Sequence, residues 1–168
     1  QNMESPTSTN SSAAAITGTK IFQNLTENER ISLFVLSTLS IPVTTISGRR
    51  NQHSHDGEIP VESRIEWNQR ILSLFKEQFM ISSDYYDAYK MISPTSYSDR
   101  QLTQEMSQVF FDIIQQHGGV PRQLLLGQIA IILILHGVYD ARGRHLIRNL
   151  RQFLRITESE YLSLEVYL

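Results

Sequence analysis

Hydrophobic residues recur along the chain at the three- and four-residue spacing that is typical of amphipathic α-helices. Thr26 and Glu29 form a capping-box pattern, which predicts a helix that begins there and runs to about Ser40, because Pro42 prevents its continuation. Pro60 can open a second helix. The apolar positions of this second helix share one face: Val61, Ile65, Leu72, Phe75 and Phe79.

Two further helices are predicted in the middle of the chain. A short helix covers about 84–92 and is stopped by Pro94. The next helix is opened by a capping box of Ser98 and Gln101 and is ended by the glycine pair 118–119. Its apolar positions form a stripe that we expect to face the core: Leu102, Met106, Val109, Phe110, Ile113 and Ile114.

The last third of the chain shows three more helix patterns. Pro121 suits the first turn of a helix that is apolar nearly all round, so we expect this helix to be central. Four of its residues are expected to be almost fully buried: Leu125, Ile129, Ile132 and Leu133. Asp140 can cap a helix that runs to about Arg155, and Thr157 with Glu160 opens the last helix.

No segment shows a sustained alternation of apolar and polar residues with period two, so we expect no strand. The pattern therefore predicts an all-α fold, a compact orthogonal bundle of about six or seven helices without a sheet. The length of 168 residues fits one domain, which we predict to span 21–168. We expect the polar residues 1–20 to form a disordered tail and 43–60 to form a mobile loop.

The two ends of the chain lead us to expect a fragment of a longer protein. The chain starts at Gln1, without Met, and it ends at Leu168 within an apolar pattern. The most apolar run, 124–138, has about 15 residues, whereas a bilayer span needs about 20. We therefore expect this run to be a core helix.

The charge balance is nearly even, with 15 Lys and Arg against 17 Asp and Glu. A domain that binds nucleic acid is usually strongly basic, so we expect no nucleic-acid partner. The chain has no cysteine. This composition excludes a disulfide scaffold, a thiol nucleophile and metal sites with cysteine ligands.

None of the common catalytic motifs occurs in the sequence, neither a Gly-x-Ser-x-Gly elbow nor a phosphate loop nor His-Glu-x-x-His. Ser73 and Lys76 match a Ser-x-x-Lys pattern whose partner motifs are missing. His53, His55 and Asp56 are suitable metal ligands, but no second cluster completes a coordination shell. We therefore predict no catalytic residue, no metal and no cofactor in this chain.

Three aromatic side chains each admit a functional and a structural interpretation. His117 precedes the glycine pair and is interpreted as a histidine at a helix C-terminus, where the dipole favours it. His136 ends the apolar helix and is interpreted as a core histidine with satisfied hydrogen bonds rather than a catalytic one. Trp67 is the single tryptophan; it can anchor a partner, but on an amphipathic helix we assign it to the core.

A run of arginines without acids favours a functional surface. The segment 141–157 contains five arginines and His145, and no acid. At about 100° per residue, four of the arginines fall within a narrow sector: Arg144, Arg148, Arg151 and Arg155. This stripe can bind phosphate, acidic lipid or an acidic partner segment, or it can be a solvated face whose cations favour the helix C-terminus. If it binds an anion, we expect the central residues, Arg148 and Arg151, to be open.

Arg142 lies off this stripe, and we expect it to pair with a buried acid or with peptide carbonyls as a structural residue. The segment 136–144 reads His-Gly-Val-Tyr-Asp-Ala-Arg-Gly-Arg, and Leu146, Ile147, Leu150 and Phe153 follow it. It resembles the Tyr-Asp-Ala-Arg-x-Arg segment in the N-terminal helical region of transmembrane and coiled-coil domain-containing, lipase-like proteins. The resemblance extends over about 30 residues. The positions that match the motif lie at a corner between two predicted helices: Tyr139, Asp140, Ala141, Arg142 and Arg144.

The family's serine elbow and membrane segment have no counterpart in these 168 residues. A weaker similarity links the chain to tellurite-resistance-type helical domains. Their acidic metal motif is not reproduced, because Asp140 is followed by Ala-Arg-Gly rather than by further acids. The second similarity therefore gives no reason to expect a metal.

The resemblance to lipase-like proteins implies hydrolase-like machinery elsewhere in a longer protein, with this domain on the cytoplasmic face of an internal membrane. Our leading hypothesis is a non-catalytic interaction or regulatory domain. Its expected partner is a protein of the membrane-trafficking machinery, such as a clathrin adaptor, or an acidic membrane lipid. Two alternatives are a lid or accessory part of a lipase-type enzyme, and a structural module that packs on the hydrolase domain through an apolar patch.

Overall fold

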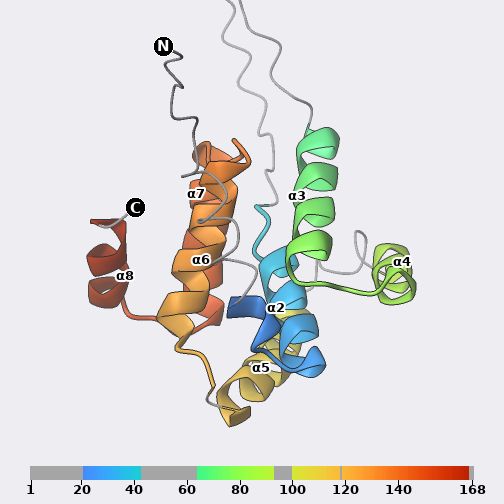
Figure 1. The fold of residues 1–168 in the computed structure, drawn as a ribbon, viewed down its shortest axis with the longest axis horizontal. Helices are drawn as coiled ribbons and strands as arrows, with labels where there is room; N and C mark the ends of the chain where they lie inside the picture. The colour runs from blue at the N-terminus through green and yellow to red at the C-terminus, as the bar shows by residue number, and fades with distance from the viewer. Residues whose placement is uncertain (1–20, 43–63, 93–99, 118, 167–168) are drawn as a thin grey trace, which may run out of the picture.

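The computed structural model describes all residues except 1–20, 43–63, 93–99, 118 and 167–168. The described residues form helices and connecting turns, and no strand occurs among them, which confirms the all-α fold (Figure 1). The expected tail and loop, together with Pro60 and Ser98, lie outside the described residues. The helices are α2 (Glu27–Leu39), α3 (Arg64–Gln78), α4 (Ser83–Ile92), α5 (Arg100–His117), α6 (Arg122–Leu135), α7 (Ala141–Phe153) and α8 (Glu158–Glu165).

Helix α2 lies at the centre of the bundle, where it packs mainly on α5 and also contacts α3 and α7. Its residues 32–38 are all buried. The hydroxyl side chains of Ser32 and Thr38 donate to carbonyls of the same helix and need no water, whereas the buried Ser37 hydroxyl has no partner in the described structure. Ser32 donates to the carbonyl of Asn28 at 2.6 Å, and Ser40 donates to that of Leu36 at 2.7 Å. The helix therefore has core neighbours on most of its sides.

Helix α6 packs on α7 and α8, and only one of its two sides is buried. The four residues predicted to be core are confirmed as buried: Leu125, Ile129, Ile132 and Leu133. The expectation that α6 is the central helix is wrong, because it also exposes large apolar residues: Leu124, Ile131, Ile134 and Leu135. The apolar run thus supplies both a core face and an exposed apolar row.

Helix α5 keeps most of its predicted stripe at the core, where Ile114 is buried and Met106 and Phe110 are partly buried, but it departs from the prediction at two positions. Phe111 and Ile114 are buried against the bundle, whereas Val109 is 57% exposed. The predicted stripe included Val109 and omitted Phe111, so this part of the prediction is wrong. The Phe111 ring lies under the guanidiniums of Arg122 and Arg155, which come from other parts of the chain, so its burial does not follow from the periodicity of α5.

Three helices end in the same way, with one residue in the left-handed conformation. These residues are Met80 (φ 55) after α3, Gly137 (φ 67) after α6 and Arg155 (φ 52) after α7. In each case the amide of the following residue donates back across the turn, as in a Schellman motif. The following residues are Ile81, Val138 and Ile156, and all three are buried. Each helix end is thereby closed by one apolar contact, and α7 ends slightly before the predicted Arg155.

None of the described helices combines the length and the apolar character that crossing a bilayer requires.

Candidate functional site

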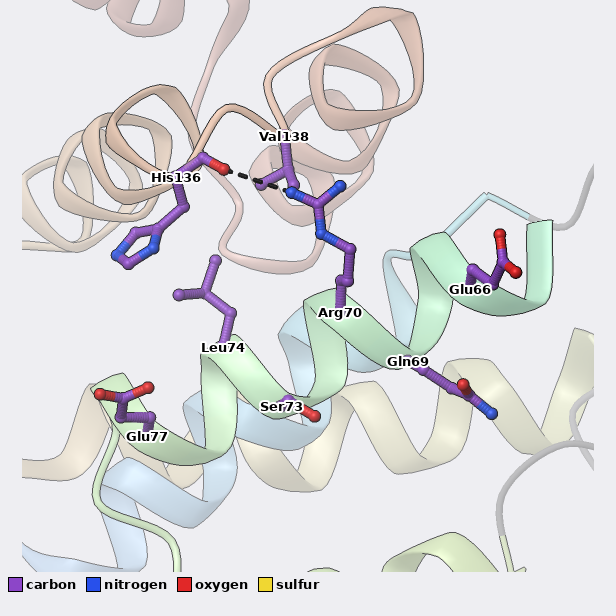
Figure 2. A pocket seen from close by; sticks show the side chains of 8 residues that line it. All are labelled: Glu66, Gln69, Arg70, Ser73, Leu74, Glu77, His136 and Val138. Carbon is purple, nitrogen blue, oxygen red and sulfur yellow. Dashed lines mark hydrogen bonds between the residues drawn. The ribbon is translucent and has the colours of Figure 1, made fainter. Parts of the chain in front are cut away.

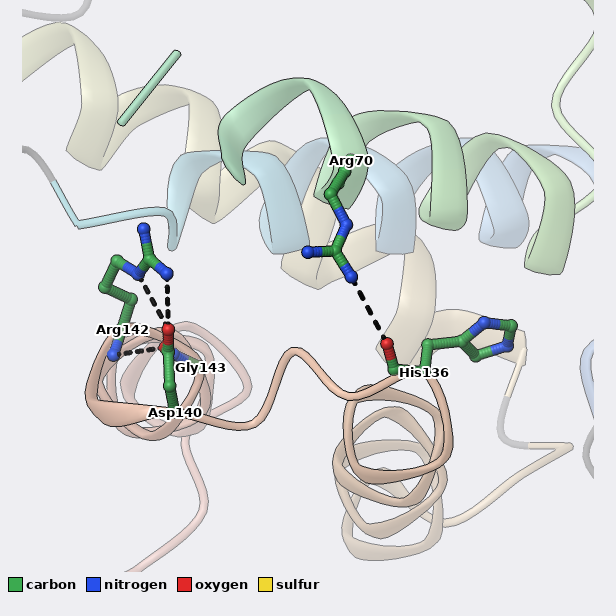
Figure 3. Close-up of polar contacts among 5 residues, drawn as sticks. All are labelled: Arg70, His136, Asp140, Arg142 and Gly143. Carbon is green, nitrogen blue, oxygen red and sulfur yellow. Dashed lines mark hydrogen bonds and ion pairs between the residues drawn. The ribbon is translucent and has the colours of Figure 1, made fainter. Parts of the chain in front are cut away.

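The start of α7 is organised around Asp140, as the cap prediction requires (Figure 3). The Asp140 carboxylate accepts hydrogen bonds from the amides of Arg142 at 2.8 Å and Gly143 at 3.1 Å. It also accepts from the Arg142 side chain, from Nε at 2.9 Å and from a terminal nitrogen at 2.5 Å. Partial burial alone would raise the pKa of Asp140, but the bonds from Arg142 and Gly143 outweigh it and lower the pKa below 3.8.

Arg142 joins this cap to the core. Its guanidinium lies 4.9 Å from the centre of the Trp67 ring, and Trp67 is buried. The core interpretation of Trp67 is therefore confirmed, whereas Arg142 pairs with an acid as expected but that acid, Asp140, is exposed rather than buried. Gly143 fits the same corner, because a Cβ there would lie 2.4 Å from the carbonyl oxygen of Val138. The corner of Tyr139, Asp140, Ala141 and Arg142 thus fixes the angle between α6 and α7.

A polar groove of about 580 Å³ lies beside this corner, between α3 and the 136–138 turn (Figure 2). Arg70 crosses it and donates to the carbonyl of His136 at 3.5 Å. The His136 side chain is exposed, so its interpretation as a core histidine is wrong. The α6–α7 turn carries this side chain past the end of the apolar helix into solvent.

The groove does not bring a nucleophile together with a base. Leu74 lies between Ser73 and the imidazole of His136, and no hydrogen bond joins these two polar groups among the described residues (Figure 2). Lys76 donates to the hydroxyl of Ser83 at 3.1 Å, so the Ser-x-x-Lys pattern forms no catalytic pair either. In the described ranges, His, Asp and Glu side chains form no group of three that could hold a metal. His53, His55 and Asp56 lie outside those ranges.

The predicted arginine stripe is divided into two parts. Arg144 and Arg148 are exposed on α7 next to His145, and neither side chain makes a hydrogen bond or an ion pair with any residue that the structure describes. Arg151 is half-buried, with its guanidinium 5.7 Å from the Tyr161 ring. The expectation that Arg151 is open is therefore wrong, because α8 folds back and places Tyr161 beside it.

Arg155 leaves the stripe because α7 ends before it. Its guanidinium lies 4.3 Å from the centre of the Phe111 ring and donates to Gln108 on α5. A further arginine, Arg122 at the start of α6, lies 5.3 Å from the same ring centre. Arg122 was not among the predicted site residues, because a single arginine after Pro121 gives no sign in the sequence that it will contact the Phe111 ring on another helix. Arg122, Arg144, Arg148, Arg151 and Arg155 together are called the arginine face below.

The carboxylates nearest to the arginine face are bound elsewhere. Asp140 binds Arg142, and Asp112 accepts from Gln108 at 2.7 Å. Glu160 accepts from Thr157 and Gln123, and its pKa is lowered first by the Thr157 amide, then by the Thr157 hydroxyl and Gln123, and also by the positive charge of Arg122. No residue of the arginine face forms an ion pair with a carboxylate within the described part of the chain. Most of the positive charges of the face are therefore without a carboxylate partner in the described structure, whereas Glu160 partly offsets the charge of Arg122.

Comparisons with family models, with curated proteins and with solved structures each find no match. The resemblance of the 136–153 segment to lipase-like proteins therefore stays a hypothesis that depends on the residues quoted for it.

Proposed function

We propose that this helical domain is a non-catalytic interaction module that binds an acidic segment of a protein partner through Arg144 and Arg148. The observation that carries the proposal is that both guanidiniums are exposed on a well-formed helix without an acid to pair with in the described structure. An arginine binds carboxylates through two parallel hydrogen bonds, so an unpaired exposed arginine retains its full binding capacity.

The geometry of the pair matches neighbouring carboxylates of a peptide. Arg144 and Arg148 are four residues apart on α7, which separates them by about 6 Å along the helix axis. Carboxylates two residues apart on an extended acidic segment, or four residues apart on a helical one, lie on the same face at a comparable spacing. The net charge of −2 gives the chain no long-range attraction to an acidic partner, so binding depends on the local contacts of Arg144 and Arg148.

The wider setting of the module is proposed from the sequence resemblance. It supports a place in a membrane-associated, hydrolase-like protein, at the cytoplasmic face of an internal membrane. In that setting the acidic partner belongs to the membrane-trafficking machinery, such as a clathrin adaptor. The motif corner of Tyr139 to Arg142 contributes by fixing the direction of α7 rather than by touching the partner, since Arg142 is bound to Asp140.

A second candidate function is a packing module or lid for a lipase-type domain. One observation favours it, namely the exposed apolar side chains of α6 and α8: Leu124, Ile131, Ile134, Leu135 and Leu162. An assay of ester hydrolysis by a longer protein, with and without residues 1–168, tests it. Equal activity would exclude the lid.

A peptide-binding experiment tests the proposed function. Fluorescence anisotropy measures the affinity of the 168-residue chain for a labelled peptide rich in Asp and Glu. We expect the affinity to fall about tenfold or more in the variant Arg144→Glu/Arg148→Glu and to weaken with added salt. The fold is expected to remain unchanged, because exposed charges contribute little to stability.

A matched control uses Lys76→Glu/Lys90→Glu, which changes the net charge equally. These lysines flank the Tyr86 ring on the α3–α4 side of the molecule, away from α7 (Figure 1). An equal loss in both variants would show that only net charge matters, and this would overturn the proposal. Binding to vesicles with acidic lipid but not to the peptide would also overturn it, in favour of a membrane.

A further inference from the structure

Two arginine side chains contact the same buried phenylalanine ring, one from the start of α6 and one from the turn after α7. The guanidinium carbons of Arg122 and Arg155 lie 5.3 Å and 4.3 Å from the centre of the Phe111 ring, which is only 2% exposed. The two positive charges are therefore within roughly 10 Å of each other, about one Debye length at 0.1 M salt. At this separation their repulsion is only partly screened.

Both side chains are held in place while most of their donors stay available. Arg122 donates one N–H to the carbonyl of Leu154 at 2.9 Å, and Arg155 donates to the side-chain oxygen of Gln108. A guanidinium carries five N–H donors, so each arginine keeps further donors. Contact with a ring desolvates the guanidinium face and leaves the edges, where the N–H groups point, for a ligand.

The charges around this pair leave it positive. Arg151, in the last turn of α7, adds a third cation four residues before Arg155. Glu160 and Asp112 are the nearby acids whose bonds are known, and both are directed at other groups: Glu160 at Thr157 and Gln123, Asp112 at Gln108. Neither carboxylate forms an ion pair with Arg122 or Arg155 in the described structure. The two arginines are thus a preformed pair of cations that forms no ion pair in the described structure, although the charge of Glu160 partly offsets that of Arg122.

We propose that Arg122 and Arg155 form a subsite for a phosphate monoester, so that the acidic partner segment carries a phosphorylated side chain. The inference rests on the proposed function, whose partner it specifies. A phosphate monoester carries about −1.5 to −2 charges and three acceptor oxygens, which suits two adjacent cations better than a carboxylate with one charge. Phosphoserine or phosphothreonine in a peptide supplies this group.

The spacing of the arginine face sets the position of the phosphate in the peptide. Arg155 is the second residue after the end of α7, so the rise of about 8 Å from Arg148 to Phe153 and the short turn that follows place it roughly 10 Å from Arg148 along the direction of the helix. An extended peptide covers this distance in about three residues, at about 3.3 Å each. The expected ligand is therefore an acidic residue followed or preceded, about three positions away, by a phosphorylated Ser or Thr.

A small-molecule titration tests the subsite by itself. Phenyl phosphate is added to the ¹⁵N-labelled 168-residue chain at constant ionic strength, and the Nε–H signals of its arginines are followed by NMR. We expect saturable shifts of the Arg122 and Arg155 signals, and at least about tenfold weaker binding of benzoate. Equal binding of the two anions, or no saturable shift, overturns the subsite.

Variants separate the subsite from the acidic-segment site. Arg155→Gln and Arg122→Gln are each expected to weaken phenyl phosphate binding about tenfold, whereas Arg144→Gln/Arg148→Gln leaves it unchanged. If one single variant fails to fold, the other single variant and the comparison of phenyl phosphate with benzoate still decide the question. Unchanged phenyl phosphate binding in a folded Arg155→Gln or Arg122→Gln variant overturns the proposal.

A pair of peptides connects the subsite to the partner. An acidic peptide with one phosphoserine three positions from a glutamate is compared with the same peptide without phosphate. We expect at least about fivefold tighter binding of the phosphopeptide, and this gain is expected to disappear in Arg155→Gln. If phosphate adds nothing, the subsite fails and the proposed function stands.

If phenyl phosphate binds but neither peptide does, the proposed function fails instead. Vesicles that contain a phosphoinositide provide the third arm. Tighter binding to these vesicles than to the phosphopeptide overturns the peptide as the source of the phosphate.

Discussion

The guanidinium of Arg142 lies 4.9 Å from the ring of Trp67, although the two residues are 75 positions apart in the sequence. The same guanidinium is held by the Asp140 carboxylate, which also caps α7. One arginine therefore links the start of α7 to the core of α3. This link makes the α6–α7 corner rigid and determines where the arginine face points.

Replacing Asp140, the cap residue of α7, is expected to lower the stability of the fold. Asp140→Ala is expected to lower the free energy of unfolding by about 1 kcal/mol, within a range of about 0.5–2, because the amides of Arg142 and Gly143 lose their acceptor. Asp140→Asn keeps a capping oxygen and is expected to cost less. Urea denaturation measures both variants, and an equal loss in the two would contradict a capping role.

The lowered pKa of Asp140 predicts a pH dependence. Because the native pKa lies below the unfolded value of about 3.9, the unfolded chain binds more protons as the pH falls, and native stability declines. The contribution of the carboxylate is complete above about pH 5 and is lost as the pH falls through the native pKa. The stability difference between the natural chain and Asp140→Asn is therefore expected to shrink below about pH 4. A difference that stays constant to pH 2 would argue against the ion pair.

Two leucines on α6 provide a comparison within one helix. Leu133→Ala is expected to cost about 2–5 kcal/mol, because Leu133 is 0% exposed and its truncation leaves a cavity. Leu135→Ala removes the same atoms from a side chain that is 59% exposed, and we expect a change below about 0.5 kcal/mol. Thermal or urea unfolding measures both. A large loss in Leu135→Ala would mean that this surface is covered in solution.

Two helical glycines are expected to respond in opposite directions to alanine. Gly143→Ala places a Cβ 2.4 Å from the carbonyl oxygen of Val138, so the backbone must shift, with an expected cost of about 1–3 kcal/mol. A Cβ at Gly127 meets only the Leu164 side chain at an ordinary distance of 3.8 Å. Gly127→Ala is therefore expected to stabilise α6 by up to about 1 kcal/mol. Stabilisation in both variants, measured by denaturation, would rule out the close approach at Gly143.

Met80, the left-handed residue after α3, is a position where a substitution is expected to stabilise the fold. Met80→Gly is expected to raise the free energy of unfolding by about 0.5–1 kcal/mol, because glycine adopts φ 55 without strain. Arg155→Gly gains the same backbone freedom but loses the contacts with Phe111 and Gln108, so we expect no net gain there. Equal stabilisation by the two substitutions would show that the contacts of Arg155 contribute nothing to folding.

The starts of three helices follow from the amino-acid sequence alone, because their start signals are local. The capping boxes at Thr26 and Thr157 and the cap at Asp140 form as predicted. Each depends on groups within three residues of one another, so no distant part of the chain can change them. The buried face of α6 was also predictable, because so apolar a helix must bury one side.

The rotation of each helix and the side chains that meet between helices depend on tertiary packing. Val109 and Phe111 are two positions apart, and the sequence pattern favoured the wrong one, because Arg122 and Arg155 from other parts of the chain cover the Phe111 ring. The arginine stripe is divided because Tyr161 and Phe111 approach it from other helices. Arg122 joins it through contacts with residues 32 positions away, at Leu154, and 11 positions away, at Phe111. Such contacts depend on the packing of whole helices, and no periodicity within one helix encodes them.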